Sequence, residues 1–399
     1  MKLHILWILL LPLTAECAAY VTQKSSALVD VIDTQAVQYT SSIAVEHQPG
    51  YLAMHPLGLY LYVSNESSGT VSVIDTEKKA SIQELSFPNP AGIAIAERGN
   101  KGYVVSGSSL ICFSTETFDV EFSIPFVGQG SKNLRLSPCG EKAYIALDSG
   151  IAYINLITKA ALHIPLKTPI EGMAIDPKGR VISAASTQKP YSAFVIDTNT
   201  HQVLHQIDLD AVAEGGRSLV ITPDGQTAFI TGENTHNVVS FDMGTGEVHP
   251  PISVGLFPRG AAITPDGAFL YVANFLSDTV SKIDIASRTI VDTISLTDEC
   301  ARIALSPQPV LYNLRSEVKK NRFLFTTRKT LQISWDKPEK GETAFFEVYR
   351  GNRLLHKIEA NQPLSFEDTP PRKAHAVRYT IIAVSKTGTR SKGHVIHIQ

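Results

Sequence analysis

The chain has 399 residues, of which 43% are hydrophobic and 19% charged, and its formal net charge is −2. This composition is typical of a globular protein and excludes a disordered or collagen-like chain. The near-neutral balance also argues against nucleic acid or an anionic membrane as a partner, because such binding needs many clustered Lys and Arg residues.

The first nineteen residues predict a cleaved secretory signal. Lys2 gives a positive start, Leu3 to Leu13 are almost wholly apolar, and small residues follow at Ala18 and Ala19. The apolar run has about half of the roughly 20 residues that a membrane-spanning helix needs. We therefore expect residues 1–19 to be a signal peptide, and the protein to be exported to the periplasm, the cell surface or the medium.

The four cysteines carry no metal-binding or haem-binding signature. A lipid anchor on Cys17 is disfavoured, because lipoprotein signals have a small residue just before the cysteine and this chain has Glu16. Cys112, Cys139 and Cys300 show no CxxC spacing, which disfavours zinc, iron–sulfur and covalent haem sites. We expect these three to be structural, and we expect no cofactor.

Two markers recur about every forty residues between residues 27 and 307. The first is an apolar stretch that closes on a turn, usually with a proline. Its seven copies reach Pro56, Glu97, Pro138, Pro177, Pro223, Pro265 and Pro307. The second is an alternating strand that ends in an Asp-Thr turn or a looser copy of it. Its seven copies end at Asp33, Asp75, Ser114, Asn155, Asp197, Asp242 and Asp284.

Two further strands complete each repeat. An aromatic strand such as Tyr62–Asn65 lies between the markers, and another, such as Ile290–Ile294, follows the Asp-Thr turn. Four short strands in about forty residues predict the blades of a β-propeller. The chain enters at the Asp-Thr element near Leu28–Asp33, and the repeats end on an inner strand at Arg302–Ser306. We predict a seven-bladed propeller of six whole blades and one composite closing blade, since closure removes exposed sheet edges.

The tetrads Tyr62-Val63-Ser64-Asn65 and Tyr271-Val272-Ala273-Asn274 resemble the YVTN family of β-propeller repeats. The second tetrad follows Ile263-Thr264-Pro265-Asp266-Gly267, which is similar to the longer motif of that family. The family is common in bacterial and archaeal envelope proteins. The resemblance implies a propeller over residues 20–308. It implies no particular function, because one fold hosts many functions.

From about Pro309 the forty-residue rhythm stops. Alternating strands are predicted at Leu331–Trp335, Phe346–Arg350 and Tyr379–Val384. Residues 309–399 resemble a fibronectin type III module, an immunoglobulin-like β-sandwich. The resemblance implies that Trp335 is the core tryptophan of the second strand and that Tyr379 is a tyrosine corner.

One group of cations is a candidate ligand-binding site. Because the inner strands converge on a channel, residues at equal positions in the repeats are expected to meet at its mouth. An Arg or Lys cluster there attracts anions and can bind a carboxylate or a phosphate. The alternative is that these cations pair with acids such as Glu171, which stands in the same column. The candidates are Lys132, Arg135, Arg217, Arg259 and Arg302.

Other polar residues are given structural interpretations. Glu66 and Asp278 follow aromatic strands, where a propeller hydrolase can place acids, but loop acids there are usually solvated. Asn65-Glu66-Ser67 matches a glycosylation acceptor, a motif short enough to occur by chance. The recurrent aspartates are expected to accept hydrogen bonds within their own turns rather than bind calcium. They are Asp33, Asp75, Asp197, Asp242 and Asp284.

No nucleotide-binding loop, HExxH or GxSxG motif occurs. The leading expectation is therefore a non-catalytic binding scaffold whose face loops contact a protein or a surface glycan. Nucleic acid and a transmembrane span are not expected. One alternative is a lactonase-type propeller enzyme that acts on an anionic sugar lactone. Another is a tetrapyrrole-handling propeller related to that of nitrite reductase, for which His47 or His55 lies near an inner strand.

Overall fold

The computed structural model describes residues 18–130, 132–307, 314–323, 326–335, 343–351, 353–359, 362, 364–368, 377–385 and 394–398. The chain separates into two compact units, Ala18–Ser306 and the residues from Pro307 onward. The described residues form strands and turns, and none of them belongs to a helix long and apolar enough to cross a membrane.

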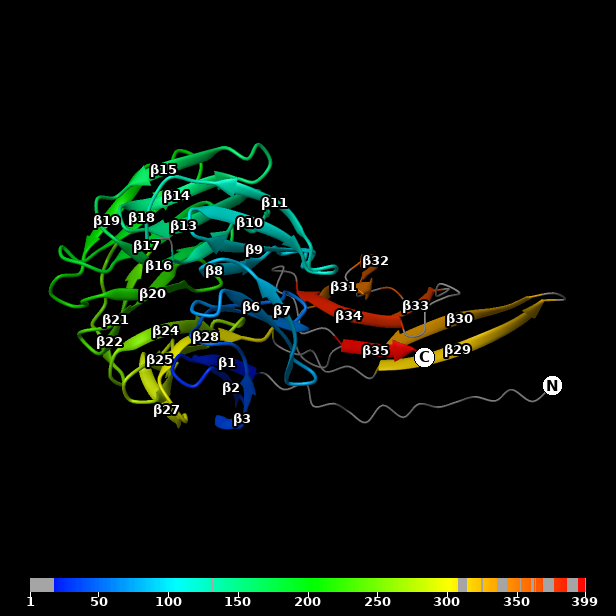
Figure 1. Cartoon of the computed structure of the whole chain (residues 1–399). Helices are drawn as coiled ribbons and strands as arrows, with labels where there is room; N and C mark the ends of the chain where they lie inside the picture. Colours follow the sequence, from blue (N-terminus) through cyan, green and yellow to red (C-terminus); the bar gives the residue numbers. More distant parts are fainter. Residues whose placement is uncertain are drawn as a thin grey trace. The chain divides into compact units, whose positions relative to one another are not determined.

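The first unit consists of seven four-stranded antiparallel sheets, the blades of a propeller (Figure 1). In each blade the strands follow one another from the centre outward. Blade 1 contains β4 (Pro49–Met54), β5 (Tyr60–Asn65), β6 (Thr70–Asp75) and β7 (Ala80–Ser86). Blade 2 contains β8 (Pro90–Ile95), β9 (Lys101–Ser106), β10 (Ser109–Ser114) and β11 (Val120–Pro125). Blade 3 contains β12 (Leu134–Leu136), β13 (Lys142–Leu147), β14 (Gly150–Asn155) and β15 (Ala161–Pro165).

The next three blades repeat this order. Blade 4 contains β16 (Ile170–Ile175), β17 (Val181–Ser186), β18 (Ser192–Asp197) and β19 (Val203–Asp208). Blade 5 contains β20 (Gly216–Ile221), β21 (Thr227–Gly232), β22 (Asn237–Asp242) and β23 (Ile252–Ser253). Blade 6 contains β24 (Pro258–Ile263), β25 (Phe269–Asn274), β26 (Thr279–Asp284) and β27 (Thr289–Ser295).

Blade 7 is assembled from both ends of the unit. It contains β28 (Cys300–Leu305) at the centre, then β1 (Ala18–Gln23), β2 (Leu28–Asp33) and β3 (Gln38–Ala44). Figure 1 shows the yellow β28 beside the blue β1, and their register pairs Ala19 with Leu305 and Val21 with Ile303. Each innermost strand contacts that of the next blade, and β28 contacts β4. The predicted seven-bladed ring with a composite closing blade is therefore confirmed.

The start of β1 bears on the predicted leader. Ala18 and Ala19 are buried in the sheet, and the Ala18 N–H donates to Ser306 Oγ at 2.9 Å. The predicted boundary after residue 19 falls inside this strand. A cut before Ala18 would leave β1 whole. Residues 1–17, including Cys17, lie outside the described residues.

The hydrophobic core of the propeller lies between neighbouring blades. Seven clusters of buried residues fill the seven gaps between successive blades, including the gap between blade 6 and the composite blade. The recurrent tyrosines add a polar link. Tyr144 OH donates to the carbonyl of Thr198 in blade 4, and Tyr271 OH donates to that of Thr34 in blade 7. These two tyrosines thus link the aromatic strand of one blade to the Asp-Thr turn of the next.

Alternating strand direction gives the propeller two different faces. Connections from the first to the second strand and from the third to the fourth lie on one face, here called the turn face. Connections from the second to the third strand and from one blade to the next lie on the other, the cavity face. On the turn face, Asp242 Oδ1 accepts the N–H groups of Gly244 and Thr245 at 2.9 and 2.7 Å. The turn role predicted for the aspartates is confirmed by the same pattern at Asp33, Asp75, Asp197 and Asp284.

The second unit contains two antiparallel sheets. One is formed by β29 (Leu314–Phe323), β30 (Thr326–Trp335) and β33 (Ser365–Asp368). The other has the order β32 (Arg353–Glu359), β31 (Thr343–Arg350), β34 (Val377–Ser385) and β35 (His394–Ile398). A buried cluster joins Ile333 of the first sheet to Phe346 and Ile381 of the second, which makes this unit a β-sandwich.

The two aromatic residues that the fibronectin resemblance singled out lie in this sandwich. Tyr379 is fully buried and its hydroxyl donates to the carboxylate of Asp368, a side chain rather than the backbone of a tyrosine corner. Trp335 ends β30, but its side chain lies outside the described residues.

Cys112, Cys139 and Cys300 are free thiols. Burial raises the pKa of Cys112 to about 11 and that of Cys300 to about 12, so both stay protonated at neutral pH. Cys139 is exposed, with its Sγ 3.2 Å from Ser137 Oγ.

Candidate functional site

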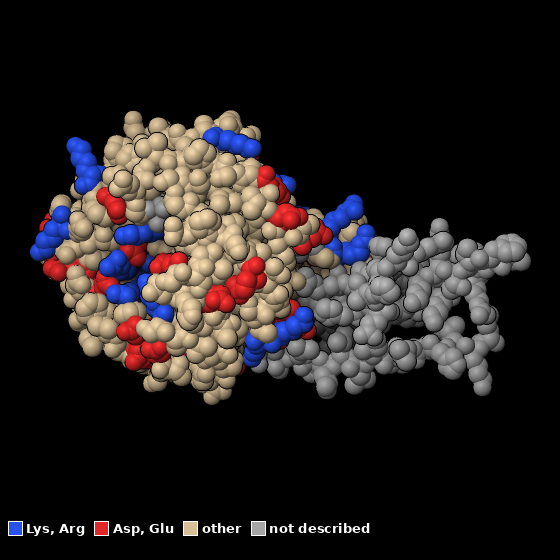
Figure 2. All heavy atoms as spheres, in the orientation of Figure 1, with Lys and Arg blue, Asp and Glu red and all other residues tan. Residues whose placement is uncertain are grey.

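A cavity of about 340 Å³ opens at the centre of the cavity face, where the innermost strands converge. In Figure 2, Lys and Arg side chains lie together with acidic side chains over the region where Figure 1 shows β16, β20 and β24. The lining combines charged and small residues. It consists of Lys24, Gly50, Tyr51, Glu66, Ala91, Lys132, Glu171, Arg217, Arg259, Ala301 and Arg302.

Two columns of the repeat build this cavity. The first column is the residue at which the chain enters each innermost strand. All seven of its members line the cavity: Gly50, Ala91, Lys132, Glu171, Arg217, Arg259 and Ala301. The second column is the residue directly after each second strand. Its members at the cavity are Lys24, Glu66, Asp148, Glu233 and Phe275, which line it or contact its cations. The second column supplies most of the acids that pair with the cations of the first column.

Glu171 is the buried centre of the ion-pair network. Its side chain is only 8% exposed, and its carboxylate accepts Arg217 Nη1 at 2.5 Å and Arg302 Nη2. Lys132 Nζ lies 3.7 Å from the same carboxylate. Burial alone would raise the pKa of Glu171, but the positive charges of Arg302, Arg217 and Lys132 outweigh it and lower the pKa to about 2. Glu171 is therefore a fixed negative charge at neutral pH.

Glu233 joins two further cations. Its Oε2 accepts Arg217 Nε at 2.5 Å and its Oε1 accepts Arg259 Nε at 2.6 Å. The guanidinium of Arg259 also stacks on Phe275, with the central carbon 3.6 Å from the ring centroid. These contacts fix the plane of Arg259 while its side chain stays 29% exposed at the cavity.

Arg302 crosses the floor of the cavity from β28. Its Nη1 donates to the carbonyls of Arg217 and Arg259, at 3.0 and 2.9 Å. Its Nη2 donates to Glu171 and to the hydroxyl of Tyr51, and its guanidinium lies over the Tyr51 ring at 4.7 Å. Arg302 thus ties the closing strand to blades 1, 4, 5 and 6.

Arg135 lies at a different position along the central channel from the other four candidate cations. It stands in the column of alanines further along the innermost strands and is absent from the cavity lining. Its Nε donates to the carbonyl of Met173 at 2.9 Å and its Nη1 to that of Leu134 at 3.2 Å. Burial and the charge of Arg302 lower its pKa to about 10, which leaves it charged at neutral pH. Arg135 thus links blade 3 to the backbone of blade 4.

Several N–H groups of the cations are not engaged by the carboxylates. All four oxygens of Glu171 and Glu233 accept a bond from a guanidinium. In contrast, Nη1 and Nη2 of Arg259 and Nη2 of Arg217 donate to no residue of the described part of the chain. The cavity therefore presents N–H donors, in a plane and at positions set before any ligand arrives.

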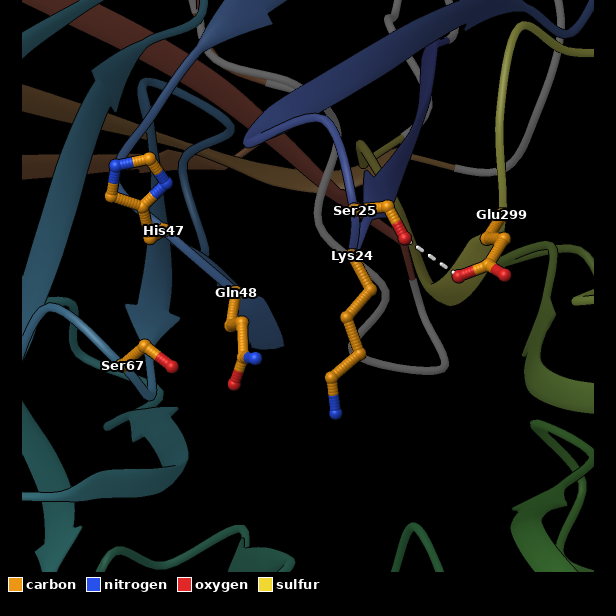
Figure 3. Close-up of a pocket in the computed structure, with 6 residues that line it drawn as sticks. All are labelled: Lys24, Ser25, His47, Gln48, Ser67 and Glu299. Atoms are coloured by element: carbon orange, nitrogen blue, oxygen red, sulfur yellow. Dashed lines mark hydrogen bonds between the residues drawn. The ribbon is translucent and has the colours of Figure 1, made fainter.

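A second depression of about 450 Å³ lies between blade 7 and blade 1 and is here called the seam pocket (Figure 3). Its blade 7 wall is fixed by a hydrogen bond from Ser25 Oγ to Glu299 Oε2 at 2.7 Å. Figure 3 shows Lys24 and Gln48 extending into the same opening. Lys24 also lines the cavity, and its Nζ lies 3.6 Å from Glu66 Oε2. The lining consists of Lys24, Ser25, His47, Gln48, Ser67 and Glu299.

Two residues that the sequence suggested for other roles are held by the fold. His55 is buried on the turn face, where its Nδ1 accepts the Leu57 N–H and its Nε2 then donates to the carbonyl of Gly99. Asn65 is buried, and its amide donates to Thr70 and Ser72. Their geometry is that of structural residues.

The remaining sequence candidates fall in three places. Glu66 lines the cavity and His47 lines the seam pocket. Asp278 lies in the β25–β26 connection, where its carbonyl accepts the Leu296 N–H. Within the described ranges, no three His, Cys, Asp or Glu side chains are grouped as metal ligands would be.

Comparison with known proteins supports the fold of the first unit. No protein-family model matches the chain. The uncharacterized protein YwhL of Bacillus subtilis (strain 168) is 25% identical over 153 residues, which are 37% of this chain and 32% of that protein. The seven-bladed β-propeller protein Rv1057 of Mycobacterium tuberculosis is 26% identical over 135 residues, 33% of each chain. The matched region thus spans about a third of each relative.

Three solved structures share the propeller architecture. Hydrazine synthase of Kuenenia stuttgartiensis superposes with a TM-score of 0.61 and 22% identity, over 67% of this chain and 92% of that one. A functionally unknown protein from Desulfotomaculum acetoxidans DSM 771 has a TM-score of 0.61 and 14% identity, over 72% of this chain and 98% of that one. The β-propeller domain of Cps50 (Swd1) from Myceliophteria thermophila has a TM-score of 0.57 and 13% identity, over 68% of this chain and 93% of that one. At these identities the likeness shows the fold alone.

Proposed function

We propose that this chain is an exported binding scaffold, a YVTN-type propeller joined to a fibronectin type III-like sandwich, whose central cavity recognises an anionic group of its partner. The predicted export signal, the YVTN-like tetrads and the envelope association of that repeat family support the location. The strand order of the two sheets in the second unit supports the fibronectin type III comparison.

One observation carries the anion-binding role. Terminal N–H groups of Arg259 and Arg217 donate to no described residue and belong to side chains that line a cavity of about 340 Å³, while each oxygen of the neighbouring Glu171 and Glu233 already accepts a guanidinium bond. A planar guanidinium with free N–H groups matches the oxygens of a carboxylate or a phosphate. Stacking on Phe275 holds Arg259 in place, so little side-chain entropy is lost on binding.

The same geometry favours binding over catalysis. A general base works best when its pKa is near the operating pH. Glu171, the most buried carboxylate of the cavity lining, has a pKa lowered to about 2 and both of its oxygens engaged. It is a poor proton acceptor at neutral pH, and its role is to orient Arg217 and Arg302.

Titration calorimetry with succinate and inorganic phosphate at fixed ionic strength tests the proposal. We expect at least one anion to bind the parent protein and its Kd to rise at least tenfold in Arg259→Ala. Arg259→Lys keeps the charge but loses the planar fork, so we expect an intermediate loss. The matched control is Arg180→Ala, an exposed turn-face arginine paired with Asp176, which should bind like the parent.

Two results would overturn the proposal. The first is no binding of either anion by the parent, or equal binding by Arg259→Ala. The second is hydrolysis of an anionic sugar lactone by the parent that Arg259→Ala abolishes, which would move the protein to the lactonase class.

A further inference from the structure

The cavity and the seam pocket are parts of one continuous surface. Lys24 lines both of them, and the consecutive residues Glu66 and Ser67 line the cavity and the seam pocket respectively. Both lie on the cavity face, because Lys24–Ser25 connect β1 to β2 and Glu66–Ser67 connect β5 to β6. The two hollows therefore adjoin each other at the boundary between blade 7 and blade 1, where Lys24 and Glu66 form an ion pair.

The residues at the rim of the cavity differ between its two sides. Three successive innermost strands, β28, β4 and β8, place the small residues Ala301, Gly50 and Ala91 at the rim. The opposite strands place Lys132, Arg217 and other charged residues there. At Gly50 a Cβ atom would lie 2.9 Å from Glu66 Oε1, so even alanine would press on the carboxylate beside Lys24. The Glu66 carboxylate thus packs over Gly50 and, with Lys24, marks the border between the cavity and the seam pocket.

The chemistry of the seam pocket differs from that of the cavity. Hydroxyl, amide and imidazole groups of Ser25, Gln48, Ser67 and His47 line it, and its one acid, Glu299, already accepts Ser25. Such a mixture of donors and acceptors suits the N–H and C=O groups of an extended peptide. A sugar ring offers an apolar C–H face that binding sites usually cover with an aromatic ring, and the seam pocket lining includes none other than the His47 imidazole.

We propose that this combined surface, here called the seam groove, binds an extended acidic peptide segment of a partner protein. A carboxylate at the end of the segment occupies the cavity at Arg259, and the preceding residues lie along the seam pocket. The inference rests on the proposed anion site and names its ligand class. Because the groove walls come from both blade 7 and blade 1, a bound segment bridges the two blades that close the ring.

The test uses the full chain and two fluorescein-labelled heptapeptide pools. One pool is randomised at five positions and ends in Asp-Glu with a free carboxylate, and the other ends in Asn-Gln amide. Fluorescence anisotropy should show the acidic pool binding at least tenfold more tightly than the amide pool. Gln48→Ala/Ser67→Ala should weaken the acidic pool at least fivefold and leave succinate binding within twofold. Gln35→Ala, an exposed turn-face glutamine, is the matched control.

The outcomes separate this inference from the proposed function. If Gln48→Ala/Ser67→Ala binds the acidic pool like the parent, or if neither pool binds a parent that binds succinate, the assignment of a peptide to the groove is wrong and the cavity site stands. If a uronic acid hexamer binds, and the double variant weakens it while the peptides do not bind, the ligand class is glycan. If Arg259→Ala changes neither succinate nor peptide binding, both proposals fall.

Discussion

The turn face and the cavity face of the propeller are built on the same strands but use their connections differently. On the turn face, Asp75 and Asp242 occupy equal positions and each accepts the N–H groups two and three residues further on. On the cavity face, the links between blades vary from three residues, 87–89, to eight, 126–133. Equal positions there hold glycine, alanine, lysine, glutamate or arginine.

This difference separates folding from recognition. Local turn bonds repeat because every blade needs the same hairpin, and each is satisfied within a few residues. The cavity-face charges satisfy one another across the ring, as when Arg302 of blade 7 meets Glu171 of blade 4. A surface of this kind can change its ligand without changing its scaffold.

The largest expected effect comes from opening the ring itself. Deleting residues 18–46 removes β1, β2 and β3 and leaves β28 without its sheet partners. We expect loss of the cooperative thermal transition of the propeller, with aggregation through the open edges. Calorimetry compares this variant with a chain ended after Ser306, which retains all seven blades and should keep the transition. A deletion variant that melts like the parent would contradict the composite blade.

On the cavity face, Glu171→Gln removes the shared acid of Arg217, Arg302 and Lys132. Breaking a buried ion pair by neutralising one partner leaves the other charges uncompensated, so we expect a loss of roughly 3 to 5 kcal/mol in the free energy of unfolding. Urea unfolding measures it, with Glu247→Gln, an exposed turn-face glutamate, as the control. Equal stability of the two variants would show that the cavity charges pair only weakly.

The pH dependence of stability isolates the same carboxylate. The pKa of Glu171 is lowered from 4.5 to about 2 in the folded protein. Its contribution is therefore fully present above pH 4.5 and is lost as the pH falls through 2. The expected contribution is about 3 kcal/mol. Urea unfolding at pH 4.5, 3.5 and 2.5 should show a steeper fall in the parent than in Glu171→Gln, and parallel curves would argue against the shift.

The smallest expected effect is on the turn face. Asp75→Ala removes the acceptor for the N–H groups of Glu77 and Lys78, both at 3.0 Å, and should cost about 1 kcal/mol. Asp75→Asn retains an acceptor oxygen and should lose less. Thermal denaturation of the two variants distinguishes them, and a loss as large as that of Glu171→Gln would remove the contrast between the faces.

The repeated parts of the fold could be predicted from the sequence, because every blade needs the same strands and turns and the corresponding residues therefore recur. The innermost strands and the aspartate turns recur about every forty residues, so their register is visible without a structure. The strand β1 was not expected. Ala18 and Ala19 were interpreted as the small residues of a cleavage site, and only pairing with β28, far away in the sequence, shows them to be buried.

The cavity could be predicted only in part. Lys132, Arg217, Arg259 and Arg302 were found from their column and do meet at the cavity, where they pair with acids as the alternative interpretation foresaw. Glu233 was missed, although it follows its second strand as Glu66 does, because pairing between two different columns depends on how blades are rotated about the axis. The position of Arg135 along the channel, away from the cavity lining, likewise depends on how the blades are arranged in space and is not visible in the sequence.

The closure of the ring also sets an order of events during synthesis. Ala18 and Ser306 are 288 residues apart in the chain and are joined by hydrogen bonds. At the usual 5 to 20 residues per second, β1 waits on the order of 15 to 60 s for β28, with its inner edge unpaired throughout. Blades 1 to 6 contain only consecutive strands and can form as they are made. The nascent protein is therefore an open arc in which the first-made part of blade 7 has an unpaired edge, and protection of that edge during the wait would govern its yield.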